Sequence, residues 1–566
     1  MAKEKMVSER LAVETNLEAD LSSATASLEF LQQLIDSALS RIKADCTKAA
    51  SLDNDLLDNW QLSSYDLAFC VAELEAARAF SDYATKTNYH SLTTRLSLFF
   101  IAEIFQSCQQ RLSNRAAELC INRQELLQLS INPLVNNLLD KYLDAGFLTA
   151  LGSEICNENI QRLPSILSEE KELVRETFFR FANDIVVPLA EEIHREDKDI
   201  PEAILKPAAE LGCFGTCIPE RFGGLQPDDR PDSLGMIVVT EELSRGSLGA
   251  AGSLITRPEI AARALLSGGT DAQQKKWLPK LAAGEMLCAI SITEPNTGSD
   301  VAAVSLKATQ TKNGWLLNGS KTWCTFAGRS ELIFVLARTN PDASLGYKGL
   351  SMFLIEKPAY PGHSFDHEQE SGGSLTGKAI ATLGYRGMHS FDLFFEDYFV
   401  PTENLVGEEQ GEGKGFYYTM SGFSGGRIQT AARATGVMQA AFEKGLSYAK
   451  ERQVFGKAVA DYQLTKVKLS RMLATLTASR QFGYAVAELM DQGGGQMEAS
   501  LVKLYTCKSA EWISREALQI HGGMGYAEES AVSRFFVDAR VLSIFEGAEE
   551  TLALKVIARN LIANAK

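Results

Sequence analysis

An acidic segment near the end of the chain contains a residue that could act as a general base. In VLSIFEGAEET, residues 541–551, Glu546 follows an isoleucine–phenylalanine pair and precedes a glycine. A carboxylate beside two large apolar side chains loses part of its hydration, which makes it a better base near neutral pH. The alternative is structural, because acidic residues at a helix start interact favourably with the helix dipole. The segment alone favours the structural interpretation, which also fits Glu549 and Glu550.

Four other segments carry side chains that could contact a flat ring or a phosphate. CAISITEPNTGSDVA (288–302) joins a strand-like half to a turn of small residues, and SKTWCTFAG (320–328) places a tryptophan and a threonine on a second strand. ERQVFGKAVADYQ (451–463) supplies an arginine for phosphate charge and a phenylalanine for packing on a ring. QIHGGMGYAEE (519–529) is a glycine-rich bend where backbone could approach a phosphate. An isolated aromatic more often packs in a core, so no single segment defines a site.

The composition restricts the class of protein. The chain has 566 residues, 45% hydrophobic and 23% charged, with a net charge of −16. The acidic charge argues against a nucleic-acid surface or an anionic membrane partner, and no apolar run approaches the length of a bilayer span. The N-terminal segment does not resemble a targeting sequence. The ten cysteines are scattered apart from Cys213 and Cys217, so we predict free thiols, no metal site and a cytoplasmic location.

The pattern of apolar residues divides the chain into four regions. Helical apolar spacing fills residues 1–155 and 165–285, alternating β-rich runs fill 286–405, and long helical segments fill 406–566. The pattern predicts a mostly α-helical protein with a central β domain, with a ligand held between the layers.

Three local features carry more specific predictions. A polar stretch at 152–163 predicts a linker, and Asn313–Gly314 and Asn318–Gly319 each predict a hairpin turn. AARAFSDYA in the N-terminal region and ASRQFGYAVA in the C-terminal region are weakly alike, which is compatible with a degraded repeat or with two unrelated helices.

Five motifs together resemble the acyl-CoA dehydrogenase family from about residue 165 to the C-terminus. TEPNTGSD, TWCTFAG, ERQVFGK, QIHGGMGY and FEG occur in the family's order and rough spacing. The resemblance implies an N-terminal α domain, a β domain and a C-terminal four-helix bundle, here preceded by an extra N-terminal helical domain. It also implies FAD as cofactor, an acyl-CoA substrate and electron-transfer flavoprotein as the partner that receives the electrons.

The resemblance assigns roles to individual residues. Glu546 would be the catalytic base, since the position that a minority of members use instead, just before Arg427, is Gly426. The Glu546 N–H and a flavin ribityl hydroxyl would polarise the substrate carbonyl, and Ser299 and Arg427 would lie along the CoA path. Ala548 replaces the family's usual threonine, which puts one cofactor hydrogen bond in doubt. The residues expected to contact FAD, some across a subunit interface, are Ile292, Thr293, Ser299, Trp323, Thr325, Arg452, Phe455, Gln463, Gln519, Gly522, Gly523 and Glu550.

Two departures from ordinary fatty-acyl members narrow the acyl group. The N-terminal extension and a polar insertion at 364–390 resemble the branch that oxidises (2S)-methylsuccinyl-CoA to mesaconyl-CoA (2-methylfumaryl-CoA) in the ethylmalonyl-CoA pathway. Burying the distal carboxylate of that substrate requires a cation or several donors. Arg257, with Thr256 assisting, falls where fatty-acyl members place pocket-end residues, so it is a candidate clamp. A surface arginine at a helix boundary is an equal alternative, and Arg386 and His389 are lesser candidates.

Several other activities are compatible with the sequence. A glutaryl-CoA dehydrogenase would decarboxylate its product after the oxidation, and an acyl-CoA oxidase would release peroxide. A short- or branched-chain acyl-CoA dehydrogenase would act on a substrate without a distal carboxylate. A non-catalytic relative that binds DNA would need a basic face, which the net charge of −16 opposes. The N-terminal extension could bind a partner, but we favour a structural role in which it caps the catalytic subunit and leaves a homodimer rather than a tetramer.

Overall fold

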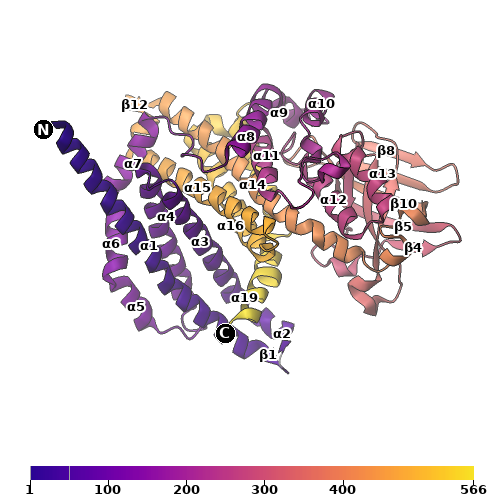
Figure 1. Ribbon diagram of the computed structural model, residues 1–566, viewed down its shortest axis with the longest axis horizontal. Helices are drawn as coiled ribbons and strands as arrows, with labels where there is room; N and C mark the ends of the chain where they lie inside the picture. The colour runs from indigo at the N-terminus through magenta and orange to yellow at the C-terminus, as the bar shows by residue number, and fades with distance from the viewer. Residues whose placement is uncertain (1, 50) are drawn as a thin grey trace. The chain divides into compact units, whose positions relative to one another are not determined.

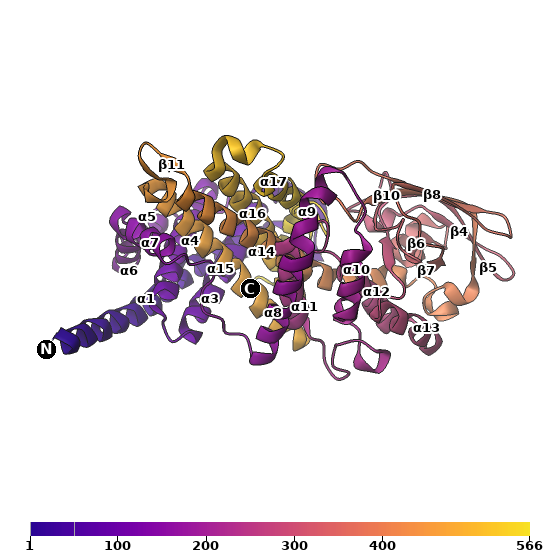
Figure 2. The ribbon, with the colours of Figure 1, turned by 90° about the horizontal axis from the view of Figure 1, so that it is seen from above.

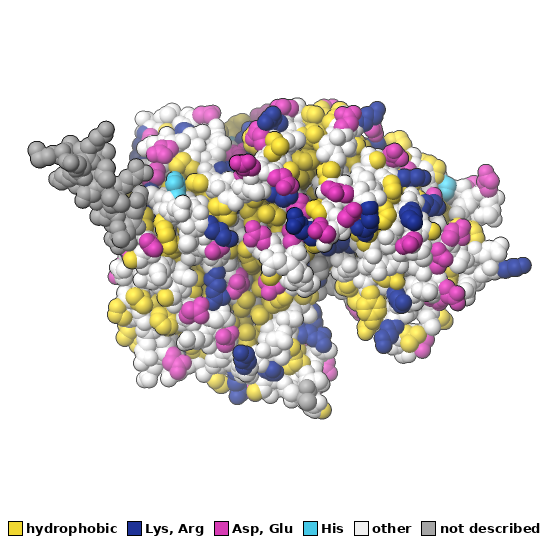
Figure 3. All heavy atoms as spheres, viewed as in Figure 1, with side chains coloured by type: hydrophobic (Ala, Val, Ile, Leu, Met, Phe, Trp, Pro, Cys, Tyr) yellow, Lys and Arg dark blue, Asp and Glu magenta, His cyan; other side chains and the backbone are white. Residues whose placement is uncertain are grey.

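The computed structural model describes residues 2–49 and 51–566. The chain divides into two compact units. The helical unit comprises Met1–Glu170, Val437–Leu489 and Gly495–Lys566, and the mixed unit comprises Lys171–Gly436 and Met490–Gly494. No helix in the described ranges combines the length and apolar character that a membrane crossing needs. On the face in Figure 3, acidic and basic side chains are interspersed.

The N-terminal extension is helical, as predicted. Its three long helices lie side by side in the helical unit (Figure 1), and large apolar residues such as Leu74 and Phe99 are buried between them. Asn132 and Asp144 accept hydrogen bonds from the first turns of the helices that follow them, which explains where those helices begin. The helices of the extension are α1 (Ala2–Cys46), α2 (Asn54–Leu57), α3 (Gln61–Lys86), α4 (Ser91–Arg115), α5 (Arg123–Ile131), α6 (Pro133–Tyr142) and α7 (Ala145–Asn157).

The linker predicted at 152–163 begins too early, because α7 continues to Asn157. Gly152 lies inside this helix, and a Cβ added to it would be 2.4 Å from the Lys466 carbonyl oxygen. The glycine therefore allows close approach of two backbones rather than a chain break. The connection without helix is limited to residues 158–168.

The C-terminal helices of the helical unit are covered by the extension. Helix α3 packs against α16 and the π-helical segment η11, and α1 packs against α19. The Phe100 and Tyr505 rings lie 6.3 Å apart, and Arg471 donates to Glu103 at 2.7 Å. The C-terminal elements are α14 (Gly415–Glu451), which belongs to both units, α15 (Gln463–Asp491), α16 (Gln496–His521), α17 (Ala531–Leu542), α18 (Glu549–Thr551), η11 (Leu552–Ala558) and α19 (Arg559–Asn564).

Helices of the mixed unit precede its sheet in the sequence. Helices α8 and α9 continue into each other through the π-helical segment η2 (Ala182–Val186), and α11 lies alongside them (Figure 2). Thr270 and Gln273 each accept a hydrogen bond from the other's backbone N–H, and this reciprocal capping box fixes the start of α13, the last helix before the sheet. These helices are α8 (Glu169–Phe181), α9 (Val187–Arg195), α10 (Glu202–Glu210), α11 (Ser233–Gly246), α12 (Thr256–Gly268) and α13 (Asp271–Ala282).

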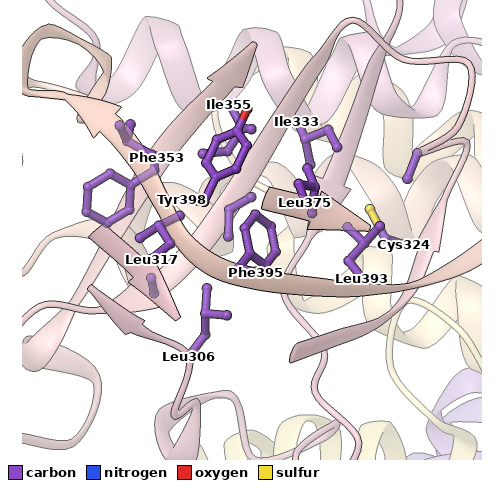
Figure 4. Packing of buried hydrophobic residues seen from close by; sticks show 14 of the residues in the cluster. Leu306, Leu317, Cys324, Ile333, Phe353, Ile355, Leu375, Leu393, Phe395 and Tyr398 are labelled. Carbon is purple, nitrogen blue, oxygen red and sulfur yellow. The ribbon is translucent and has the colours of Figure 1, made fainter. Parts of the chain in front are cut away.

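The predicted central β domain is a sheet in the order β3-β6-β4-β5-β10-β9-β8, with β7 also paired to β6. Alternating apolar residues of these strands, among them Leu317, Phe353 and Leu393, meet in one buried core (Figure 4). The strands are β3 (Cys288–Ser291), β4 (Lys307–Gln310), β5 (Gly314–Thr325), β6 (Leu332–Arg338), β7 (Leu350–Glu356), β8 (Ser364–Glu368), β9 (Ser374–Ala379) and β10 (Ser390–Pro401).

Only one of the two predicted hairpin turns is present. Asn313–Gly314 ends the turn between β4 and β5, as predicted, whereas Asn318 lies within β5 opposite Lys307. Its side chain donates to Asp397 at 3.0 Å and accepts from the Asp397 backbone N–H at 3.0 Å. Asp397 lies where the β5–β10 register shifts, so the asparagine supports an irregularity in the neighbouring strand instead of making a turn.

Candidate active site

The loop between α17 and α18 in the helical unit presents Glu546. This residue has a positive φ of 54° and is partly exposed. Lys503 donates to the Gly547 carbonyl at 2.6 Å, and the Glu549 N–H donates to the Ser543 carbonyl at 3.0 Å, which closes the loop. Left-handed backbone is uncommon for residues other than glycine and is concentrated at functional sites.

The apolar pair before Glu546 is less buried than the sequence predicts, because Phe545 is half-buried and Ile544 is exposed. The Ile544 side chain is 53% exposed within the chain. Glu549 and Glu550 occupy the first turn of α18, as predicted. Full desolvation of Glu546 therefore requires groups outside this unit of the chain, such as a bound substrate.

A second group of predicted residues lies on the surface of the helical unit. Phe455 forms the tip of a short hairpin between Gln453–Val454 and Lys457–Ala458, has a φ of 49° and is 96% exposed. Arg452 and Gln463 beside it are also exposed, and Gln463 donates to Thr149 of α7 at 3.0 Å. A phenylalanine held in strained backbone and fully open to solvent is better explained by a binding partner than by packing.

The glycine-rich bend after α16 leaves open space beside its backbone. A Cβ added to Gly522 or Gly523 would meet no atom within 4 Å, and Gly522 has a φ of 58°. Gln519 in the last turn of α16 and Glu550 in α18 are exposed. The bend can therefore accept a group against its main chain.

Another group of the residues predicted from the sequence lies on the β domain, where the end of β3 meets β5. Lys321 donates to the Ile292 carbonyl at 2.8 Å, and the Thr322 N–H donates to the Thr293 carbonyl at 2.9 Å. These bonds bring Ile292 and Thr293 next to the end of β5, which carries Trp323 and Thr325. Trp323 has a φ of 56° and an exposed ring, and Thr325 shares a hydrogen bond of 2.9 Å with Ser390.

A buried ion pair fixes this strand end. Lys321 Nζ lies 2.9 Å from Glu294 Oε1, and Glu294 also accepts from the Leu306 N–H at 2.7 Å. Burial lowers the pKa of Lys321 to about 8, although Glu294 opposes this effect. Burial tends to raise the pKa of Glu294, but Lys321 and the Leu306 N–H outweigh it and hold the pKa below its usual range.

Replacing Glu294 by glutamine is expected to lower the free energy of unfolding by about 3–5 kcal/mol at neutral pH, because it leaves Lys321 as an unpaired buried cation. In the wild type, Glu294 contributes to the free energy of unfolding above the pKa that it has in the unfolded chain. This contribution is lost as pH falls through the lower pKa of Glu294 in the folded protein. Without Glu294 the pKa of Lys321 falls further, so the variant should recover stability as pH rises through neutrality. Urea unfolding between pH 4 and 9 measures both trends, and parallel curves for the two proteins would contradict this prediction.

Arg257 lies at the start of α12 and is 8% exposed, so the surface interpretation of this residue is wrong. Its guanidinium donates to the Ser253 carbonyl at 3.0 Å and to the Tyr385 hydroxyl at 3.1 Å, and lies 3.6 Å from the Met388 sulfur. Within the described residues no carboxylate lies in ion-pair range of Arg257. The buried Thr256 hydroxyl has no hydrogen-bond partner among the described residues. A buried cation without a counter-charge is a ready partner for an anion.

Arg386 and His389, the lesser candidates for binding the distal carboxylate, already contact other groups of the protein. Arg386 donates to the His194 carbonyl at 2.9 Å, and its Nε lies 3.6 Å from Asp197. His389 Nε2 lies 3.2 Å from Asp199 Oδ1. Asp197, His363 and His389 form the one group of possible metal ligands in the described residues. The nearby guanidinium supplies positive charge to Asp197, which favours an ion-pair cluster over a cation site.

Helix α14 positions the predicted CoA-path residue Arg427 beside α12. A Cβ on Gly425 would be 1.7 Å from Glu259 Oε1, so glycine is required for the two helices to approach. Gln429 donates to Glu259 at 3.0 Å one turn further on. Arg427 is partly buried in this helix, and Ser299 is exposed in the turn after β3.

Sequence reasoning did not find the groups that surround Arg257. Tyr385 and Met388 belong to a loop about 130 residues away from it in the chain. The left-handed φ of Tyr385, 58°, has no signal in the sequence, because tyrosine is not a residue type that favours this region. Only the folded loop brings the hydroxyl to the guanidinium.

Comparison with known proteins decides the family. Residues 168–285, 289–398 and 413–562 match the models of the N-terminal, middle and C-terminal domains of acyl-CoA dehydrogenase. The chain belongs to the acyl-CoA dehydrogenase family. The fold predicted from the five motifs, including the extra N-terminal helical region, is therefore confirmed.

Several relatives of this acyl-CoA dehydrogenase are known. The chain is 46% identical over 397 residues to (2S)-methylsuccinyl-CoA dehydrogenase of Cereibacter sphaeroides, covering 70% of each protein. It is 36% identical to 3-(aryl)acrylate reductase of Clostridium sporogenes, covering 70% of this chain and 99% of the relative. The structure of butyryl-CoA dehydrogenase from Megasphaera elsdenii superposes with a TM-score of 0.63 at 30% identity, covering 70% of this chain and 98% of the other.

The family uses FAD, and the surface residues of this chain fit such a cofactor. The open space beside Gly522 and Gly523 suits a phosphate or nucleotide. The exposed rings of Phe455 and Trp323 suit stacking on a flat ring system. Each of these features lacks an explanation from packing within its own unit.

Proposed function

We propose that this acyl-CoA dehydrogenase oxidises (2S)-methylsuccinyl-CoA to mesaconyl-CoA (2-methylfumaryl-CoA), a step of the ethylmalonyl-CoA pathway. The observation that carries the proposal is Arg257, a buried guanidinium with no carboxylate in ion-pair range within the described residues. The 46% identical relative named (2S)-methylsuccinyl-CoA dehydrogenase supports the same substrate.

The chemistry of the Arg257 environment suits the end of a short dicarboxylic acyl chain. A carboxylate would pair with the guanidinium and could also accept from the Thr256 hydroxyl, which has no other partner among the described residues. The Tyr385 hydroxyl at 3.1 Å from Arg257 would hold the guanidinium in place. A hydrocarbon end would leave the cation buried and unpaired, so the pocket would discriminate against fatty-acyl groups.

Glu546 is the proposed base. Its carboxylate would remove the α-proton of the thioester, and its backbone N–H would donate to the carbonyl oxygen as negative charge develops there. FAD, when bound, supplies the acceptor for the hydride that leaves the β-carbon, so that a C=C bond forms as two C–H bonds break. We assign Arg452, Phe455, Gln463, Gln519, Gly522, Gly523, Glu550, Ile292, Thr293, Ser299, Trp323 and Thr325 to FAD binding, and Ser299 and Arg427 also to the CoA path.

We further propose that electrons pass to electron-transfer flavoprotein and that the enzyme is a cytoplasmic homodimer. The dimer is supported by α3, which covers α16 and η11 within the same chain and so occupies a surface that is unavailable to another subunit. Light scattering on the intact protein should give the mass of two chains. A mass of four chains would contradict this arrangement.

A panel of acyl-CoA substrates assayed with ferrocenium as electron acceptor tests the substrate. We expect methylsuccinyl-CoA to give the highest kcat/KM among methylsuccinyl-, glutaryl-, isobutyryl- and butyryl-CoA. Preferred turnover of glutaryl-CoA with release of CO₂ would favour a glutaryl-CoA dehydrogenase, and preferred turnover of butyryl- or isobutyryl-CoA would favour a short- or branched-chain enzyme. Stoichiometric peroxide in air would indicate an oxidase, and a colourless protein that does not take up FAD would favour the non-catalytic class.

A further inference from the structure

We infer that the N-terminal extension positions the loop that carries Glu546, and that Tyr65 in α3 is the positioning residue. The inference rests on the proposed role of Glu546 as base, and it gives the extension a part in the reaction beyond covering the C-terminal helices. The contacts that support it all lie within the helical unit.

The first step is a direct hydrogen bond from the extension to the loop. The Tyr65 hydroxyl donates to Glu549 Oε1, which lies 484 positions later in the chain. Lys508 of α16 lies 3.2 Å from Glu549 Oε2, so the same carboxylate joins α3 and α16 to the start of α18, where the loop ends. The Glu549 side chain is only 11% exposed, and a charge-assisted bond to a carboxylate is stronger than a bond between neutral groups.

The second step is that Tyr65 is itself held firmly. Its ring lies 4.9 Å from the ring of Phe69, over which the Arg111 guanidinium lies at 5.1 Å. Arg111 in turn pairs with Asp66 at 3.1 Å. Burial, together with the hydrogen bond to Glu549, raises the pKa of Tyr65 well above its usual value, so the hydroxyl remains a donor throughout the working pH range.

The third step is that the loop needs fixed ends. Glu546 has a φ of 54°, a backbone conformation that a residue other than glycine keeps only when neighbouring contacts impose it. The Glu549 N–H closes the loop on Ser543 at 3.0 Å, and Lys503 holds the Gly547 carbonyl at 2.6 Å. Since Glu549 is three residues from Glu546, a change in its position is transmitted directly to the base.

These contacts define what Tyr65 does. It does not touch the reacting atoms, but it determines where the carboxylate and backbone N–H of Glu546 lie. Small displacements of a reacting group cost large factors in rate while leaving ground-state binding nearly unchanged.

Tyr65→Phe, which removes one oxygen atom, tests the inference in the full-length holoenzyme. We expect the rate of flavin reduction by methylsuccinyl-CoA to fall about tenfold with KM changed by less than about twofold. Peptides covering residues 543–549 should also exchange amide hydrogens faster, which is a readout independent of activity. An unchanged rate together with unchanged exchange in this segment would overturn the inference.

Asp58→Asn is the matched control. Asp58 pairs with Lys555 at 2.5 Å, so the substitution also weakens a contact between the extension and the C-terminal helices, but it does not touch the loop. We expect this variant to keep the wild-type rate. An equal loss in both variants would mean that the extension acts only through general stability, which would overturn the role of Tyr65.

Two further variants separate the possible failures. If Tyr65→Phe does not fold, Glu549→Ala removes the acceptor from the other side and should give the same loss of rate and the same faster exchange, whereas wild-type values would overturn the inference. Glu546→Gln checks the underlying assignment. If Glu546→Gln is active, the proposed base is wrong, and if it is inactive while Tyr65→Phe behaves as wild type, only the positioning role fails.

Discussion

Glu546→Gln is expected to lower the rate of flavin reduction by roughly 10³- to 10⁴-fold, because the amide cannot accept the α-proton of the thioester. The substitution keeps the size of the side chain and the backbone N–H of residue 546. FAD content and substrate affinity should therefore remain close to wild type. Stopped-flow measurement of the loss of flavin absorbance on mixing with methylsuccinyl-CoA checks the result.

The control for this prediction is Glu498→Gln. Glu498 lies in the first turn of α16, where it represents the helix-entry role that Glu546 would have on the structural interpretation. The control should bleach at the wild-type rate with at most a small loss of stability. If both variants behave alike, Glu546 is a helix-entry charge and not the base.

Arg257→Leu is expected to lower kcat/KM for methylsuccinyl-CoA by about 10²- to 10³-fold, because truncating one partner of a buried charge pair costs about 2–5 kcal/mol. Activity with butyryl-CoA should be retained or increased, since leucine removes a cation that an apolar chain cannot pair. The ratio of the two kcat/KM values, measured with ferrocenium, is therefore the decisive quantity. It is insensitive to the fraction of correctly folded enzyme.

Arg257→Lys provides the conservative control. A lysine keeps the positive charge but lacks the planar pair of donors. Arg257→Lys should therefore be more active with methylsuccinyl-CoA than Arg257→Leu and less active than the wild type. Full activity of Arg257→Leu with methylsuccinyl-CoA would rule out the clamp. Equal loss with all acyl-CoAs would indicate that Arg257 supports α12 through Ser253 and Tyr385 instead.

Local patterns in the sequence were sufficient for the architecture. The β-rich runs LCAISI and ELIFVLAR predicted strands of the β domain, and the apolar spacing of residues 64–86 predicted an amphipathic helix, because both signals are local properties of the chain. The same reasoning failed at Asn318 and Gly152. Each residue type has a usual local role, but here one supports an irregular neighbouring strand and the other permits a close helix contact.

The five motifs and their spacing are properties of the linear chain, so they were enough to predict the family, the order of its domains and the candidate base. The fold was needed to show that Arg257 is buried without a carboxylate partner among the described residues, and that Tyr65 contacts Glu549 across 484 positions. Burial and long-range contacts depend on how helices and strands pack against one another. No local pattern of residues encodes that packing, so these two features become visible only in the folded chain.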